Sequence, residues 1–357
     1  MTSRSPKRRR TTASSSSLTR RRFLGGALAL PAAAAIPSQF VGRAAAAVFG
    51  PEPRAGAALG PGQASPYAVV LGTAQDAGVP QVNCFSDNCN AVRRGERPAP
   101  RVSSIGLVDP AADKRFIFDA TPDFASQVGE LLAHPPGAPP PSGSVPLEEH
   151  LHGIFLTHAH MGHYTGLIHL GREGAAARGL PLYVSGPMAS YLGANEPWAF
   201  LVRNEHVRLV ELEPGVRIAL TDSLAVTAFD VVHRQEFTDT LGFLIHGPER
   251  TLMFVPDADV WEGWKVPFEQ LFERSDVALI DGSFFSYDEL GHRPQGDVPH
   301  PPVVTSIDLL GDRRGDREVW FIHLNNTNPL WDPDSRENEV VGDAGFGVAH
   351  RGQIFGL

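Results

Sequence analysis

Three histidines after a short apolar run limit what this chain can fold into more than any other feature of its sequence. His158, His160 and His163 follow residues 153–156 (Gly-Ile-Phe-Leu), which have the pattern of a buried strand. On an extended backbone His158 and His160 project to the same side, and His163 comes around the following turn. Three neutral imidazoles around one point suit Zn²⁺ or a similar borderline metal. The segment therefore predicts a metal site at the end of a buried strand.

The first 47 residues have the order of charged, apolar and small residues that is found in export signals. Basic residues between positions 4 and 10 precede Arg20-Arg21-Arg22-Phe23-Leu24, an apolar stretch over 25–36 and an alanine run over 44–47. The alternative is a basic arm for nucleic acid, but such arms are not normally followed by an apolar segment and a cleavage region. Paired arginines before Phe23 indicate the twin-arginine route. We expect residues 1–47 to be a twin-arginine signal peptide, the export machinery to be a partner, and the mature protein to be periplasmic or secreted.

Without this leader the chain is strongly acidic. The leader holds nine of the 31 Lys and Arg residues and none of the 40 Asp and Glu residues, which leaves a formal net charge of −18. A nucleic acid partner is disfavoured because phosphate binding needs a basic surface. The apolar stretch of the leader is shorter than the roughly 20 residues of a spanning helix, and no second one follows. We therefore do not expect a membrane-integral protein.

The rest of the chain alternates strand and helix patterns after a Pro, Gly and Ala-rich spacer over 48–66. We expect strands over 67–73, 104–108, 115–119, 153–156, 182–185, 207–212, 224–232, 241–245, 251–255, 277–280 and 319–322. Helices are expected over 124–133, 166–171, 262–272 and 306–311. Many strands with interleaved helices predict one α/β layered domain over 67–357, with functional residues on the loops at strand ends.

Only two cysteines occur, Cys84 and Cys89. In an oxidising compartment they could close a short disulfide or stay free thiols. They could also be what remains of a structural zinc knuckle, although two thiolates do not fill a tetrahedral site. That ligand count favours the disulfide or the free thiols.

Three more potential ligands each follow an apolar strand. His233 comes after 228–232, Asp257 after 252–256 and His323 after 319–322. Taken singly, such a strand-end residue is more often a turn or cap residue. Together with the three clustered histidines they form a six-residue inventory that could hold two metals sharing one carboxylate.

With these residues the chain resembles the metallo-β-lactamase superfamily, whose motif is His-x-His-x-Asp-His followed by a distant His, an Asp and a last His. It is most similar to the pyrroloquinoline quinone (PQQ) biosynthesis protein B family and the related cyclic phosphodiesterases. The similar stretches are 71–74 (Leu-Gly-Thr-Ala), 78–81 (Gly-Val-Pro-Gln) with Cys84, 165–167, 171–174 and above all 322–329 (Ile-His-Leu-Asn-Asn-Thr-Asn-Pro). The resemblance implies an αββα sandwich with one or two zinc ions, or Mn or Fe, at one edge. It also implies that His158, His160, His163, His233, Asp257 and His323 are the ligands.

Two positions depart from the superfamily pattern. Gly162 stands where the motif has its Asp, which ligates the second metal and orients water. We therefore expect the second site, left with His163, Asp257 and His323, to be weaker or empty unless another carboxylate such as Glu236 or Asp239 replaces it. The cysteine-rich knuckle of the family survives only as Cys84 and Cys89.

The ligand residues and the leader together predict an exported metal-dependent hydrolase. It would use a metal-activated water on a small anionic substrate, and PQQ or a precursor is one candidate. Asp257 would bridge two ions or act as general base. Asn325, Asn326 and Thr327 would donate hydrogen bonds to the substrate, although a tight turn capped by their side chains is equally consistent. Asp281 would support a ligand histidine without itself binding the metal. Further candidates at the edge of the site are Asp119, His169, Arg172 and Glu173, but for these an ordinary turn or solvated role is the expectation. The competing function is a non-catalytic carrier of PQQ or a similar cofactor.

Overall fold

The structure is a computed structural model and describes residues 42–43, 65–136, 142–143, 145–290 and 298–357. The predicted signal peptide (1–47) and spacer (48–66) lie almost wholly outside these residues. Within the described part of the chain, no helix is both long and apolar enough to cross a membrane.

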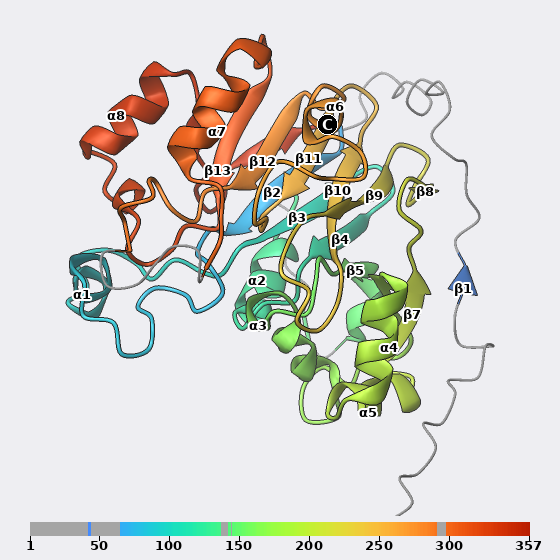
Figure 1. The fold of residues 1–357 in the computed structure, drawn as a ribbon. Helices are drawn as coiled ribbons and strands as arrows, with labels where there is room; N and C mark the ends of the chain where they lie inside the picture. The colour runs from blue at the N-terminus through green and yellow to red at the C-terminus, as the bar shows by residue number, and fades with distance from the viewer. Residues whose placement is uncertain (1–41, 44–64, 137–141, 144, 291–297) are drawn as a thin grey trace, which may run out of the picture. The chain divides into compact units, whose positions relative to one another are not determined.

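Two mixed sheets form the centre of the fold (Figure 1). The first sheet has the order β1-β7-β6-β5-β4-β3-β2-β15, and the second has the order β14-β13-β12-β11-β10-β9-β8. The first contains β1 (Gly42–Arg43), β2 (Tyr67–Gly72), β3 (Ser104–Asp109), β4 (Lys114–Phe118), β5 (Gly153–Phe155), β6 (Leu180–Val184), β7 (Val207–Glu211) and β15 (Ile354–Gly356). The second contains β8 (Arg217–Ala219), β9 (Ala225–Val231), β10 (Thr240–His246), β11 (Thr251–Val255), β12 (Val277–Asp281), β13 (Glu318–Ile322) and β14 (Gly347–Val348).

The central strands β2, β3, β10 and β12 are buried on both faces because each sheet packs against the other sheet on one side and against helices on the other. In β2, Val69 and Leu71 belong to the outer core of the first sheet, and Ala68 and Val70 to the core between the sheets. This alternation follows from the two-residue period of a strand. An aromatic stack of Phe118 on Phe155, with ring centroids 4.6 Å apart, fills the layer between the sheets.

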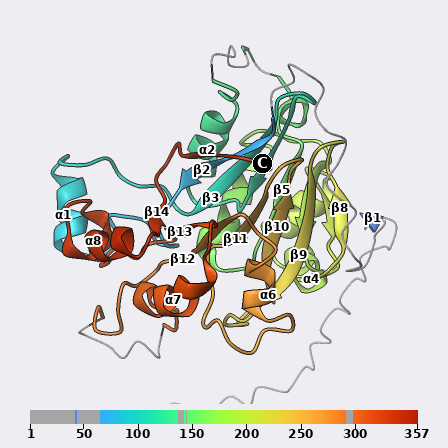
Figure 2. The same ribbon diagram turned by 90° about the horizontal axis from the view of Figure 1, so that it is seen from above.

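Helices cover the outer faces, which confirms the predicted four-layer αββα sandwich. The helices beside the first sheet are α2 (Phe124–Leu131), α3 (Met161–Tyr164), α4 (Gly186–Ala194) and α5 (Trp198–Arg203), and those beside the second are α6 (Phe268–Phe272), α7 (Val303–Leu310) and α8 (Arg336–Asp343). Figure 2 shows the sheets between α2 on one side and α6 and α7 on the other. α1 (Asp87–Arg93) packs through Cys89 against Ala74 and Val79.

Two predicted helices differ from the observed ones. The predicted helix over 262–272 is helical only in α6, because Gly263 has a φ of +79° and Pro267 precedes the first helical turn. The predicted helix over 166–171 is a 3₁₀ helix over Thr165–Leu170. Several further elements were not predicted from the sequence, and most of them are short or lie in the C-terminal part of the chain: α1, α3, α4, α5, α8, β8, β14 and β15.

The two sheets are joined at one edge by backbone pairing of the segments after β2 and β13. Ala74 forms a bridge with Leu324, and the backbone amide of Leu324 donates to the carbonyl of Thr73 at 2.8 Å. Strand ends from both sheets therefore meet at this edge, and the predicted ligands follow these strands.

Candidate metal centre

Six predicted ligands converge at the edge where strands of both sheets end. His158, His160 and His163 follow β5, whereas His233, Asp257 and His323 follow β9, β11 and β13 of the second sheet. They form two groups of potential ligand atoms, each with its atoms within 4.8 Å of one another, and Asp257 belongs to both.

The first group consists of His158, His160, His233 and Asp257. Nδ1 of His160 lies 3.0 Å from Nε2 of His233, and Oδ2 of Asp257 lies 3.3 Å from the same nitrogen and 3.4 Å from Nε2 of His158. A tetrahedral zinc ion with bonds of about 2.0–2.1 Å holds its ligand atoms about 3.3 Å apart. Nε2 of His158 is buried and has no hydrogen-bond partner among the described residues. The geometry and the chemistry of this donor set therefore fit zinc.

In each of the five histidines, one ring nitrogen faces the centre and the other contacts an outer partner. These partners are Thr157 Oγ1 for His158 (2.9 Å), Glu236 Oε2 for His160 (2.9 Å), Asp119 Oδ2 for His163 (2.7 Å), Asp259 Oδ1 for His233 (2.7 Å) and Ser283 Oγ for His323 (2.9 Å). Metal-binding histidines generally have such partners, which fix the tautomer and orient the ring.

The second group contains a residue that the sequence analysis missed. Asp76, in the loop after β2, joins His163, Asp257 and His323. Its Oδ1 lies 3.2 Å from Nε2 of His163 and 3.1 Å from Nε2 of His323, and its Oδ2 accepts a hydrogen bond from the Gly162 amide at 3.1 Å. The second group therefore has a carboxylate besides Asp257, despite the glycine in the motif.

Glu236 and Asp239, the two carboxylates suggested as replacements for the motif aspartate, are not part of the second group. Glu236 contacts the outer nitrogen of His160, and Asp239 hydrogen-bonds with Ser185. Asp76 could not be found from spacing, because its loop is far from the histidines in sequence. It reaches them through the pairing of β2 within the first sheet and the bridge between Ala74 and Leu324.

Asp119 was expected to be an ordinary turn residue, but it is fully buried beside the second group. It accepts a hydrogen bond from the backbone amide of Thr157 at 2.8 Å and contacts His163.

Two residues of the centre have a left-handed backbone conformation. Asp119 has a φ of +67° and His323 a φ of +68°, a strained conformation for non-glycine residues. Such strain is concentrated at functional sites, where the surrounding structure enforces it.

Asp281 lies behind the centre, at the end of β12. It accepts hydrogen bonds from the backbone amides of Ala258 at 3.0 Å and Ser283 at 2.7 Å, and it lies 2.8 Å from Nδ1 of His300. Since Ser283 contacts His323, Asp281 supports that histidine through Ser283 rather than directly. His300, which the sequence analysis did not single out, forms a third group with Asp257, Asp281 and His323.

The predicted substrate-binding residues form a hydrogen-bonded turn. The side-chain amide of Asn325 donates to Thr327 at 2.6 Å, and that of Asn326 donates to the sulfur of Cys84 at 2.9 Å. The hydroxyl of Thr327 in turn donates to Glu289. This arrangement corresponds to the alternative in which the side chains cap a turn.

Cys84 and Cys89 are free thiols. They lie beside this turn, and Cys84 is half-buried while Cys89 is fully buried. No ligand group with three or more His, Cys, Asp or Glu side chains includes them within the described residues.

Burial and charge set the ionisation of the metal centre. Burial holds the pKa of His158 well below its usual range and also lowers that of His160. Burial alone would raise the pKa of Asp257, but the neighbouring His233 and His323 lower it well below its usual range. Two neutral imidazoles and an ionised carboxylate are the forms that bind a metal.

The second group has a different charge balance. Burial disfavours a charge on His163, but Asp119 and Asp76 outweigh it and raise the pKa of His163 well above its usual range. A metal bound here must displace that proton, so its affinity rises with pH.

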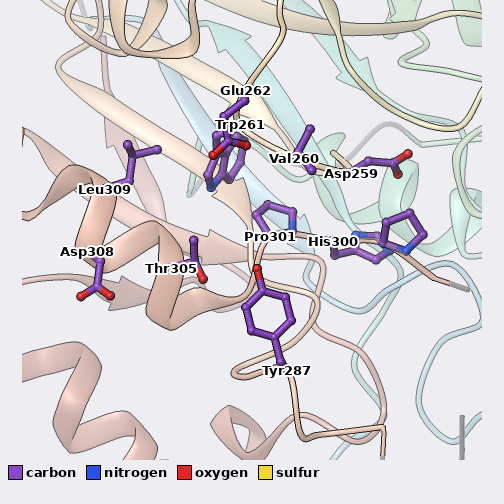
Figure 3. Close-up of a pocket in the computed structure, with 11 residues that line it drawn as sticks. Asp259, Val260, Trp261, Glu262, Tyr287, His300, Pro301, Thr305, Asp308 and Leu309 are labelled. Carbon is purple, nitrogen blue, oxygen red and sulfur yellow. The ribbon is translucent and has the colours of Figure 1, made fainter. Parts of the chain in front are cut away.

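A cavity of about 470 Å³ borders the centre (Figure 3). Asp259 and His300 lie at one end of it, and Trp261, Tyr287 and Leu309 line the rest. Asp259, Glu262 and Asp308 give its described lining an acidic character.

The fold and the ligand groups define the class of protein. The chain belongs to the beta-lactamase superfamily domain family, whose model matches residues 114–324. The matched region contains the six predicted ligands and ends just after His323.

Among curated proteins the chain is similar to the Coenzyme PQQ synthesis protein B of two bacteria. It is 28% identical to that of Methylococcus capsulatus over 311 residues, covering 79% of this chain and 97% of the relative. It is 29% identical to that of Methylobacillus flagellatus over 309 residues, again covering 79% and 97%. The predicted homology with PQQ synthesis protein B is therefore confirmed.

Solved structures show the same fold. The crystal structure of Zn²⁺-bound PqqB from Methylobacterium extorquens matches with a TM-score of 0.68 at 23% identity and covers 82% of this chain and 100% of that one. A diphosphatase from the PhnP family matches with a TM-score of 0.56 at 17% identity, covering 82% and 98%.

Proposed function

We propose that this protein is a metal-dependent hydrolase that acts on a small substrate at a two-metal centre. The observation that carries the proposal is the pair of ligand groups that meet at Asp257. The superfamily match and the fold shared with a diphosphatase support a hydrolytic reaction.

The residues of the chain divide into two sets around Asp257. His158, His160 and His233 would hold the first zinc ion, and His163 and His323 would contribute to the second. When bound, the zinc supplies a Lewis acid that lowers the pKa of water towards neutrality and polarises the scissile bond. Oδ2 of Asp257 lies 3.3 Å from His233 and 3.7 Å from His163, which favours a shared ligand over a free general base.

The cavity beside the centre restricts the substrate. Its apolar and aromatic wall suits an uncharged part of a small molecule, while its carboxylates repel an anionic group. An anionic group of the substrate would therefore lie at the metal edge, where the ions attract it.

The test combines metal content with turnover. Protein purified without a histidine tag is measured by elemental analysis and assayed with a bis-aryl phosphodiester. We expect bound zinc and turnover in the wild type, and loss of the first ion and of turnover in His158→Ala. His350→Ala, at an exposed position, is the matched control and should keep both. A fully loaded wild-type protein without turnover on phosphodiester, lactone or amide substrates would contradict the proposal.

The second candidate function is the binding of PQQ or a precursor without catalysis. Homology with PQQ synthesis protein B favours it. Equilibrium dialysis with PQQ distinguishes the two functions: zinc-dependent binding of unchanged PQQ, together with no hydrolysis, would favour the carrier.

Export is a separate proposal, which rests on residues 1–47. We expect the protein with its natural leader to accumulate outside the cytoplasm, and the Arg21→Lys/Arg22→Lys variant to remain inside. Cell fractionation measures this, and equal export of both forms would exclude the twin-arginine route.

A further inference from the structure

Position 162 has no room for a side chain. A Cβ atom on Gly162 would lie 2.5 Å from Cα, 2.7 Å from Cγ and 2.8 Å from Cβ of Asp76. Real contacts of this kind are longer than 3.0 Å, and the nearest atom belongs to the backbone, which cannot simply rotate away. The space that the motif aspartate would enter is therefore filled by another aspartate from a different segment of the chain.

The carboxylate of Asp76 points to the nitrogens that a second metal would use. Its Oδ1 lies closer to Nε2 of His163 and of His323, at 3.2 and 3.1 Å, than Asp257 does, at 3.7 and 3.8 Å. These distances match the separation of about 3.3 Å between ligand atoms on tetrahedral zinc. The other oxygen, Oδ2, accepts the amide hydrogen of Gly162 at 3.1 Å, which fixes the orientation of the carboxylate.

The backbone beside Asp76 is held against the segment that carries His323. The amide of Gln75 donates to the carbonyl of Leu324 at 2.9 Å, and the amide of Leu324 donates to Thr73 at 2.8 Å. Asp76 and His323 are thus held in register by hydrogen bonds on neighbouring residues. Such a rigid support is what a metal ligand needs.

We infer that Asp76 supplies the second metal with the carboxylate ligand that the superfamily motif places at position 162. The carboxylate ligand has moved from the loop after β5 to the loop after β2. This change requires a glycine at position 162, because Asp76 occupies the space that a side chain there would need. The inference rests on the two-metal centre of the proposed function, but it concerns metal occupancy and not turnover. It replaces the expectation that the glycine leaves the second site weak or empty.

Two variants test the inference by different routes. Asp76→Asn keeps the size of the side chain but removes the charge that holds the metal. Gly162→Ala keeps every ligand residue unchanged in the sequence but forces the backbone of Asp76, and with it the carboxylate, away from the second metal position. We expect the wild type to bind two cobalt(II) or zinc ions per chain, and each variant to keep the first ion while the second binds at least about tenfold more weakly.

Each variant has a matched control. Asp87→Asn changes an exposed aspartate near the same loop, and Gly129→Ala adds a Cβ that meets nothing within 4 Å. Both should bind two ions as the wild type does. Retention of the first ion in Asp76→Asn and Gly162→Ala shows that these variants are folded.

The readout is the number of ions per chain, from elemental analysis and from the visible spectrum during cobalt(II) titration. Two ions bound with unchanged affinity in Asp76→Asn would overturn the inference, and so would a wild type that binds fewer than two ions in metal excess. Two ions in the wild type without hydrolysis would contradict the proposed hydrolase but leave the role of Asp76 intact.

Discussion

Each histidine of the centre is oriented by a residue that does not itself reach the metal position. For His233 this residue is Asp259, whose Oδ1 lies 2.7 Å from Nδ1 of the imidazole. The contact leaves Nε2 of His233 facing His160 and Asp257. Partners of this kind fix the tautomer and commonly change metal affinity by 10- to 100-fold when they are removed.

We therefore expect Asp259→Asn to weaken the first metal about 10- to 100-fold and to leave the second nearly unchanged. Competition with a chromogenic chelator measures both affinities. Asp230→Asn is the matched control, because Asp230 lies nearby on β9 but pairs with Lys265 and should have no effect on either ion. Equal weakening of both ions would show that Asp259 acts on the fold and not on His233.

Glu289 should make stability depend on pH. Burial raises its pKa from 4.5 to about 7, although hydrogen bonds from Thr327 and the Phe285 amide partly oppose this. Between about pH 4.5 and 7 the unfolded state has lost this proton while the native state keeps it, so the free energy of unfolding falls as pH rises. The loss is on the order of 3 kcal/mol and is complete about one pH unit above 7, once the native state has also lost the proton.

Glu289→Gln should remove this part of the pH dependence. Urea unfolding at pH 5 and pH 8 should give a smaller difference between the two pH values in the variant than in the wild type. Glu249→Gln, at an exposed position, should behave as the wild type. An unchanged difference in Glu289→Gln would contradict the assignment.

At the scale of elements, the strands were predictable and many helices were not. Strands such as β2 and β11 are unbroken apolar runs, because both of their faces are buried, and such runs are visible without knowledge of the fold. The missed helices α1 and α5 have 7 and 6 residues, too few for a clear helical period. β15 has 3 residues and depends on pairing with β2.

The same distinction applies to the site. Five histidines and Asp257 could be proposed because each follows a strand or lies in a compact motif. Asp76 was missed, and Asp119 was assigned an ordinary turn role, because what each residue does depends on which strands become neighbours. Pairing between strands distant in sequence is a property of the fold and not of local spacing.

The layer between the sheets should be sensitive to truncation. Phe155 is fully buried and stacks on Phe118 and on Tyr183, with ring centroids 4.6 and 4.3 Å apart. Phe155→Ala should lower the free energy of unfolding by about 3–5 kcal/mol, because it leaves a cavity in this layer. Ile168→Ala, at an exposed position, should cost less than about 0.5 kcal/mol. Denaturant unfolding of both variants measures the difference, and similar losses would contradict it.

At the scale of the whole domain, the ligands come from both sheets, so metal binding should stabilise the fold. His158 follows a strand of the first sheet, whereas His233 and Asp257 follow strands of the second. A ligand that binds only the native state stabilises it by about 2.7 kcal/mol at a free concentration of 100 times its Kd.

Removal of zinc should therefore lower the unfolding temperature, and added zinc should restore it in a concentration-dependent way. Differential scanning calorimetry with and without chelator measures this. The His158→Ala variant should show a smaller change than the wild type, and an unchanged unfolding temperature after complete removal of zinc would contradict the linkage.

The most direct test of the two-metal centre is the number of metal ions per chain in wild-type protein purified without a histidine tag and equilibrated with excess zinc. The ligand groups around Asp257, with Asp76 in the second group, predict close to two ions. A value near one would contradict the second site, and a protein that binds no metal would contradict the metal centre altogether.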